Sequence, residues 1–207
     1  GDVYKRQVPW MMSPMPPDAL RREFAATRRR SLEDCASLEA EDYTLQAAAF
    51  ASPPKWHLAH TSWFFETFIL KPFADGYASP DERYEMLFNS YYNGIGEQHP
   101  RDRRGLLSRP LLAEVLAYRE HVDAAMVELL SPGAPAAVYE RCVLGVEHER
   151  QHQELMFTDI KYSLAANPMF PAFTPPAGSA SKATGNRPLA WDRFDGGLLE
   201  IGATGEV

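Results

Sequence analysis

The chain has 207 residues, of which 45% are hydrophobic and 24% charged, and this ordinary globular composition excludes disordered, collagen-like and coiled-coil proteins. Its 28 Asp and Glu residues outnumber its 21 Lys and Arg residues, and the net charge of −7 argues against a nucleic-acid partner because it repels a polyphosphate. The sequence has neither the roughly 18 consecutive apolar residues of a membrane helix nor a secretory signal, so we expect no membrane partner. Cys35 and Cys142 show no CxxC spacing, which favours the reducing cytoplasm as the location.

The spacing of apolar residues predicts four long helices and one short, aromatic-rich helix. We expect them at about 18–40, from Ser52 to Lys71, within 81–93, from Pro110 to Ser131 and at about 135–165. The stretch from Gly94 to Pro110 is expected to be a loop because of its glycines and prolines. Without a convincing strand before residue 190, the pattern indicates an all-α fold, an antiparallel four-helix bundle over 18–166.

The two ends of the chain differ from this bundle in composition. Residues 1–17 are interpreted as an artefactual or disordered N-terminus, because Gly1 to Gln7 look like translated adapter sequence before a start codon. Residues 167–190 are rich in Pro, Gly and Ser and are expected to form a linker arm. The segment 191–207 reads as the opening strand of an α+β domain, so we expect a truncated second domain.

Arginines cluster in two places. The runs at 21–22 and 28–30 lie on the first predicted helix near Glu33 and Asp34, and we interpret them as a solvated face. The loop cluster includes Arg101 and Arg104, whose guanidinium forks suit carboxylates, although a solvated basic loop explains such a cluster equally well.

Histidines form the most informative pattern. His148 and His152 are four residues apart on the last predicted helix, a spacing that can chelate one metal ion. Leu144 and Leu155 extend the same stripe, which predicts that the imidazoles face the bundle core. A third ligand is needed, and the second helix offers His57 and His60, with His60 on the face expected to be buried. Either could instead be a buried histidine that donates to a backbone carbonyl.

The segment 148–152 also fits HExxH, the zinc-protease motif in which the Glu is the general base. That motif normally has uncharged residues between the Glu and the second His and an apolar residue at its end, whereas this chain has Arg150, Gln151, Gln153 and Glu154. Leu155 and Thr158 replace the Gly and His of its extended form. We therefore disfavour the protease interpretation.

Four segments together resemble a known family: SPPKWHLAHTSWFFETFIL, LFNSYYNGIGEQHPRDRRGLLSRP, VLAYREHVDAAM and VEHERQHQELMFTDIKY. They are similar to the N-terminal DinB-like domain of the EgtB-type sulfoxide synthases of ergothioneine biosynthesis. The tail WDRFDGGLLEIG resembles the first strand of that family's second domain, which has the fold of the formylglycine-generating enzyme.

The resemblance implies a cytoplasmic non-haem iron oxidoreductase, in which Fe(II) is held by His60, His148 and His152. It implies O2-dependent joining of a thiol, γ-glutamylcysteine or cysteine, to carbon 2 of hercynine, with the thiol donor's carboxylates bound by Arg101 and Arg104. We expect one of Glu147, Gln151 and Glu154, which lie beside the ligand pair, to orient a ligand imidazole, with Glu154 as the first choice. His57 would then support the ligands from behind or have a structural role.

The family takes much of the hercynine pocket, including a tyrosine that assists the chemistry, from its second domain, so we expect this chain alone to be inactive. The competing prediction is a DinB-like, three-His metal-dependent thiol S-transferase. A third possibility is a bundle in which a metal has only a stabilising role.

Overall fold

The computed structural model describes residues 16–90, 92, 94–173 and 190–198, and within these residues the chain contains helices and no strand. The unit that begins at Pro17 carries all of the helices. Its four long helices are α1 (Pro17–Glu33), α2 (Pro54–Phe65), α5 (Leu112–Leu129) and α6 (Ala136–Ala165). Its shorter elements are η1 (Asp42–Thr44), η2 (Glu66–Leu70), α3 (Lys71–Phe73), α4 (Tyr84–Phe88) and η3 (Arg101–Leu106).

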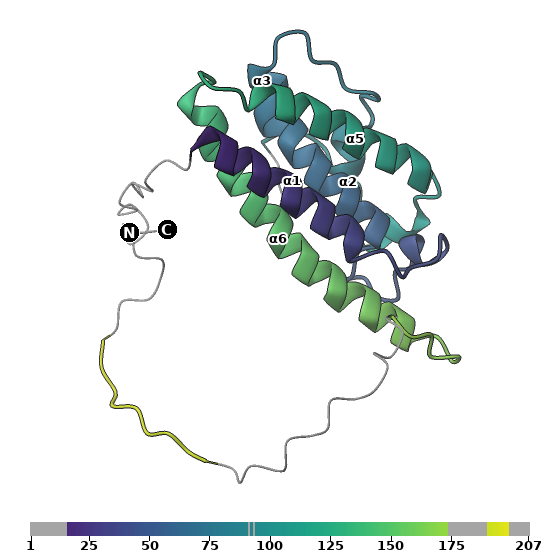
Figure 1. The fold of residues 1–207 in the computed structure, drawn as a ribbon. Coiled ribbons are helices and arrows are strands. Elements are labelled where there is room, and N and C mark those ends of the chain that lie inside the picture. Colours follow the sequence, from purple (N-terminus) through teal and green to yellow (C-terminus); the bar gives the residue numbers. More distant parts are fainter. Residues whose placement is uncertain (1–15, 91, 93, 174–189, 199–207) are drawn as a thin grey trace. The chain divides into compact units, whose positions relative to one another are not determined.

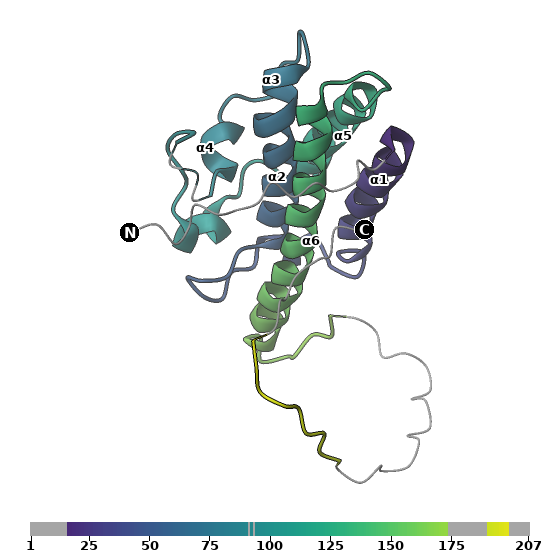
Figure 2. The same ribbon diagram turned by 90° about the vertical axis from the view of Figure 1, so that its left-hand side faces the viewer.

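The long helices lie side by side, as Figures 1 and 2 show from two directions. The helix α2 packs on both α5 and α6, while α1 packs mainly on α6. All twelve residues of α2 are buried, so its polar side chains need hydrogen-bond partners inside the protein. Lys55, for example, donates from Nζ to the backbone carbonyls of Leu107 and Pro110, at 2.7 and 2.9 Å. This contact fixes the end of the loop before α5.

The second helix continues almost without interruption from α2 to the end of α3. Between them η2 forms a π-helical turn, and Phe73 ends the run close to the predicted stop at Lys71-Pro72. The first helix, in contrast, ends at Glu33 rather than near residue 40. After it the chain forms tighter turns, in one of which the Cys35 N–H donates to the Leu32 carbonyl. The predicted loop before α5 contains the 3₁₀-helix η3.

A glycine lets α6 approach α2 closely. A Cβ at Gly145 would lie 2.4 Å from Cε1 of Phe65, well inside van der Waals contact. Gly145 therefore places the C-terminal end of α2 directly against the middle of α6.

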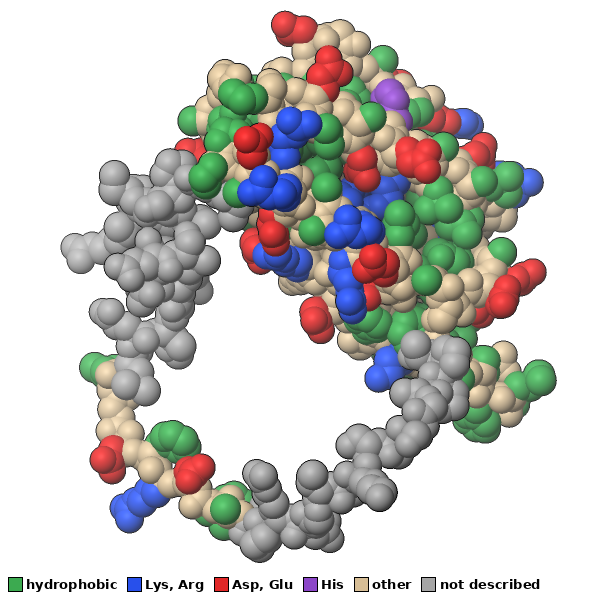
Figure 3. All heavy atoms as spheres, in the orientation of Figure 1, with side chains coloured by type: hydrophobic (Ala, Val, Ile, Leu, Met, Phe, Trp, Pro, Cys, Tyr) green, Lys and Arg blue, Asp and Glu red, His purple; other side chains and the backbone are tan. Residues whose placement is uncertain are grey.

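The arginines of α1 divide between surface and interior. Basic and acidic side chains are interspersed on the face shown in Figure 3, and Arg29 and Arg30 pair with Glu33 and Asp34 as the sequence indicated. Arg28 is the exception to the predicted solvated face. It is buried, because its guanidinium lies between carboxylates of α5 and α6.

Several sequence predictions concern residues near the chain ends. Phe173, at the start of the predicted arm, packs edge-on against Phe157 of α6 at 5.5 Å between ring centroids. Residues 1–15, 174–189 and 199–207 lie outside the described residues. Residues 190–198 form neither a helix nor a strand, and the side chains of Trp191 and Phe194 are exposed. The predicted strand thus finds no support in its described part.

Both cysteines are buried free thiols, and burial raises the pKa of each to about 12. None of the described helices combines the length and the apolar character needed to cross a bilayer.

Candidate metal centre

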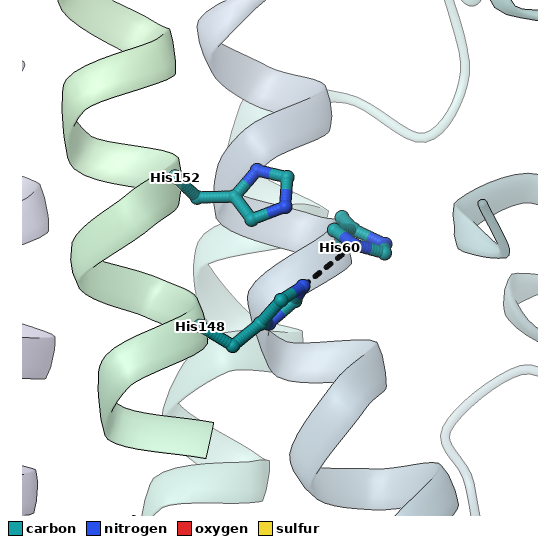
Figure 4. A group of neighbouring side chains, drawn as sticks. All are labelled: His60, His148 and His152. Atoms are coloured by element: carbon teal, nitrogen blue, oxygen red, sulfur yellow. Dashed lines mark hydrogen bonds between the residues drawn. The ribbon is translucent and has the colours of Figure 1, made fainter. Parts of the chain in front are cut away.

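Three imidazoles from two helices converge at the α2–α6 contact. His60 projects from α2, and His148 and His152 project from successive turns of α6 (Figure 4). One ring nitrogen of each histidine lies within 4.8 Å of the others. Nε2 of His60 is 3.3 Å from Nε2 of His148, and the His152 ring centroid is 4.6 Å from both other rings. The structure thus brings together the three histidines that the sequence singled out.

Aromatic rings hold His60 in place. Its imidazole is stacked on the indoles of Trp56 and Trp63, at 4.6 and 5.5 Å between centroids. Its Nδ1–H donates to the backbone carbonyl of Phe88 at 2.6 Å, so its Nε2 carries the lone pair in the neutral ring. His60 is therefore a buried histidine bonded to a backbone carbonyl, as the alternative interpretation expected. That bond uses only Nδ1, so Nε2 can still bind a metal.

His148 stacks on Phe64 at 4.4 Å, and its Nδ1 is buried without a hydrogen-bond partner. Its Nε2 lies 3.3 Å from Nε2 of His60, and the two nitrogens share one proton when no metal is bound. A cation between them would take the place of that proton.

His57 lies directly behind His152. The two Nδ1 atoms are 2.9 Å apart, and Nε2 of His57 lies 3.1 Å from Oδ2 of Asp159. His57 and Asp159 are both buried. We predicted from the sequence that His57 supports the ligands, but Asp159, seven residues after His152 on α6, was not predicted. Asp159 lies two helical turns after His152 and therefore on the same side of α6, so this spacing could have predicted that it lies near the site.

Burial keeps the histidines neutral. It lowers the pKa of His148 to about 4 and that of His60 well below the usual value, and the neighbouring imidazoles add to the effect on His60. The pKa of His152 is lowered by burial first and by His60 second. Neutral imidazole is the form that binds a metal ion.

The donor set fits a divalent transition metal. Metal–nitrogen bonds of about 2.1 Å meeting at about 90–110° place two ligand nitrogens roughly 3.0–3.4 Å apart. The 3.3 Å between His60 and His148 lies in this range. Imidazole suits iron, zinc, copper and nickel, so the ligand type alone does not select one of them.

The three histidines line a cavity of about 250 Å³, which Arg101 and Arg104 also line. Arg104 is buried, with its guanidinium 3.4 Å above the Trp56 ring, and it donates to Ser52 Oγ at 2.9 Å and Ser90 Oγ at 3.0 Å. In the 3₁₀-helix η3, residues three apart lie on the same side, which brings both arginines to the cavity. The alternative interpretation, that these arginines belong to a solvated basic loop, is therefore wrong for Arg104.

Glu149 does not face the three histidines. Its carboxylate is fully buried and forms ion pairs with Arg28, at 3.0 Å, and with Arg119. The Ser31 hydroxyl also donates to it, at 2.6 Å. Despite burial, the two arginines lower its pKa to about 2. A carboxylate held in this way cannot act as the general base of an HExxH protease, so the structure removes that alternative.

Two details of the predicted stripe on α6 are wrong. Leu144 is 60% exposed and Leu155 is 38% exposed, so the histidines lie at the edge of the buried face of α6 rather than at its centre. Glu154 is exposed, and its described hydrogen bond runs from Thr158 Oγ1 to its backbone carbonyl. Of the residues expected behind the ligands, His57 makes that contact, while Gln151 lines the cavity.

The remaining histidines lie elsewhere. His99 and His121 are each hydrogen-bonded through Nε2 to a backbone carbonyl, of Arg103 and Ala78 respectively. Neither belongs to the cluster.

Comparison with protein families gives one match. The profile of the DinB superfamily matches residues 23–156, well over half of the chain. The chain belongs to the DinB superfamily. The match spans α2 and the part of α6 that carries His148 and His152, so all three clustered histidines belong to the DinB domain. No individual curated protein matches the chain. DinB superfamily domains are often metal-dependent enzymes, and the three-His cluster of this one could bind a metal ion.

Proposed function

We propose that this DinB domain is the metal-binding part of an iron(II)- and O2-dependent sulfoxide synthase of ergothioneine biosynthesis. The enzyme would join γ-glutamylcysteine or cysteine to carbon 2 of hercynine. The observation that carries the proposal is that His60, His148 and His152 meet at a cavity that buried Arg104 also lines. Bound Fe(II) would supply the redox chemistry that activates O2 for C–S bond formation.

The cavity residues would orient the thiol donor. Arg104 is held by the Trp56 face and two serine hydroxyls, so its charge has a fixed position beside the imidazoles. A carboxylate of the thiol donor bound by Arg101 and Arg104 would direct the thiol toward the three histidines. Trp56 and Tyr92 also line the cavity and would shield the reacting groups from water.

A second candidate function is a metal-dependent thiol S-transferase that uses zinc or nickel. The residues matched by the DinB profile favour it as much as the oxygenase, because they contain the complete three-His cluster without any second domain. Both candidates need a thiol and an anion-binding cavity. They differ in whether the metal changes its oxidation state.

The proposal includes an architecture. Residues 18–166 would form the DinB-type antiparallel four-helix bundle, and 191–207 would begin a domain like the formylglycine-generating enzyme. The second part rests on the resemblance of the tail WDRFDGGLLEIG, in which Trp191 and Phe194 are exposed among the described residues.

The test begins with metal binding by this chain. Purified under anaerobic conditions, it is reconstituted separately with Fe(II), Zn(II) and Ni(II), and the bound metal is counted after dialysis. Each form then receives γ-glutamylcysteine or cysteine together with hercynine or histidine, with and without O2. Turnover is also measured on protein that includes the proposed second domain, since part of the acceptor pocket is placed there.

The two functions predict different products. A sulfoxide that forms only with iron and O2 supports the oxygenase. A thioether that forms without O2 in the zinc or nickel form, from the thiol and an added electrophile such as monobromobimane with loss of bromide and a proton, supports the transferase. If the metal only raises the thermal stability and no thiol binds, both proposals are wrong.

A further inference from the structure

A line of three polar side chains leads from the histidine cluster into the interior. His152 contacts His57 at 2.9 Å between the Nδ1 atoms, and His57 contacts Asp159 at 3.1 Å between Nε2 and Oδ2. Asp159 Oδ2 also accepts the backbone N–H of Ser52 at 2.8 Å. His57 is 4% exposed and Asp159 is 5% exposed, so water does not compete for these contacts.

The hydrogen bond between Ser52 and Asp159 determines which nitrogen of each imidazole carries the proton. The backbone N–H of Ser52 is always a donor, so Asp159 Oδ2 acts as an acceptor. A neutral His57 then carries its proton on Nε2 and donates it to Asp159, which leaves a lone pair on Nδ1. Two nitrogens 2.9 Å apart need one proton between them, and it must therefore sit on Nδ1 of His152. His152 is left with its lone pair on Nε2.

We propose that His57 and Asp159 are positioning residues that hold His152 in the tautomer with Nδ1 protonated, so that its Nε2 faces the metal. The inference rests on the metal site of the proposed function. The pair would hold the proton on Nδ1 of His152, as the backbone carbonyl of Phe88 does for Nδ1 of His60. The aspartate acts through His57 and does not touch the metal.

The same arrangement distinguishes His152 from His148. Nδ1 of His148 is buried without a hydrogen-bond partner, so no described residue holds a proton on that atom. The pair also links α2 to α6, because His57 belongs to α2, Ser52 lies just before it and Asp159 belongs to α6. A purely structural role would consist of this link alone, and the experiment must separate the two roles.

The first measurement determines the ring tautomers in the metal-free chain by long-range ¹H–¹⁵N correlation NMR of its histidines. We expect His152 to be protonated on Nδ1 and His57 on Nε2. A His152 protonated on Nε2, or in fast exchange between both tautomers, would overturn the proposal. This measurement needs no metal, so it gives an answer even if the proposed function fails.

The second measurement compares two substitutions of His57 by competitive chelator titration with Co(II). His57→Phe removes both contacts and should weaken metal binding about 10–100-fold. His57→Gln can accept from His152 with its carbonyl oxygen and donate to Asp159 with its amide, so its affinity should stay within about threefold of the wild type. In His57→Phe the His152 ring should also lose its single tautomer.

Unfolding curves of the metal-free variants provide the control. If both variants are destabilised equally but bind Co(II) as the wild type does, the pair is only a structural link and the proposal is wrong. If His57→Phe does not fold, Asp159→Leu is compared with Asp159→Asn in the same way, since only Asn can still accept from His57. A wild-type chain that binds no Co(II) would contradict the metal site, whereas the NMR result would still decide the tautomer.

Discussion

His148 and Glu149 are consecutive on α6 but have different surroundings. His148 lines the cavity with the two other clustered histidines, whereas Glu149 is enclosed by Arg28 of α1 and Arg119 of α5. Successive helical residues differ by about 100° in direction, so one turn of α6 carries both a metal ligand candidate and a buried ion cluster. This division explains why the HExxH pattern of this chain does not form a protease site.

Glu149→Gln should destabilise the protein by about 3–5 kcal/mol, because it leaves the buried Arg119 without its carboxylate and the buried Arg28 with Asp123 alone. Urea unfolding of the metal-free protein measures this change. The control is Glu147→Gln, which removes an exposed pair with Arg150 and should cost less than about 1 kcal/mol. Equal effects of the two substitutions would contradict the buried ion cluster.

Gly145→Ala should also lower stability, by about 1–3 kcal/mol, because the new methyl group would collide with Phe65. The higher helix propensity of Ala, about 1 kcal/mol, offsets part of this cost. The double variant with Phe65→Leu provides the matched test, since the smaller side chain removes the collision. We expect Gly145→Ala to be far less costly in that background, and additive effects would show that the two residues do not interact.

The stability of the metal-free protein should fall as the pH is lowered from about 6.5. The folded-state pKa of His148 is about 4 and those of His60 and His152 are also lowered, so below pH 6.5 the unfolded chain binds more protons than the folded chain. Urea midpoints between pH 7.5 and 5 test this. His148→Phe should reduce the slope. Midpoints that do not change across this range would contradict the burial of neutral imidazoles.

Arg104→Gln should weaken binding of γ-glutamylcysteine at least about tenfold, because the cavity loses its buried cation. Isothermal titration of the metal-loaded protein measures the affinity. Arg103→Gln is the matched control, since Arg103 is an exposed residue of the same 3₁₀-helix. If the two variants bind the thiol equally well, Arg104 has no part in recognising its carboxylates.

Much of this architecture could be predicted from the sequence. The long helices follow from apolar spacing and from prolines, and the three histidines follow from their spacing together with the family resemblance. The buried face of α6 was misplaced, because Gly145, Glu149 and Asp159 lie on it among apolar residues and none of these three has a hydrophobic side chain. Hydropathy instead selected Leu144 and Leu155, which are exposed.

Long-range partners account for the other differences. Glu149 is buried only because arginines from two other helices, far apart in the sequence, meet it there. Asp159 likewise gains its role from Ser52 and His57, which belong to the start of the second helix. No local pattern contains these contacts.

One metal ion should bind to His60, His148 and His152, and a count of the bound metal measures this. The wild type, the three single Ala variants and His121→Ala are loaded with Fe(II) under anaerobic conditions, dialysed and analysed for iron. We expect about one equivalent in the wild type and in His121→Ala, and less than about one tenth in each of the other three. Full iron content in a folded His60→Ala, His148→Ala or His152→Ala protein would contradict the account.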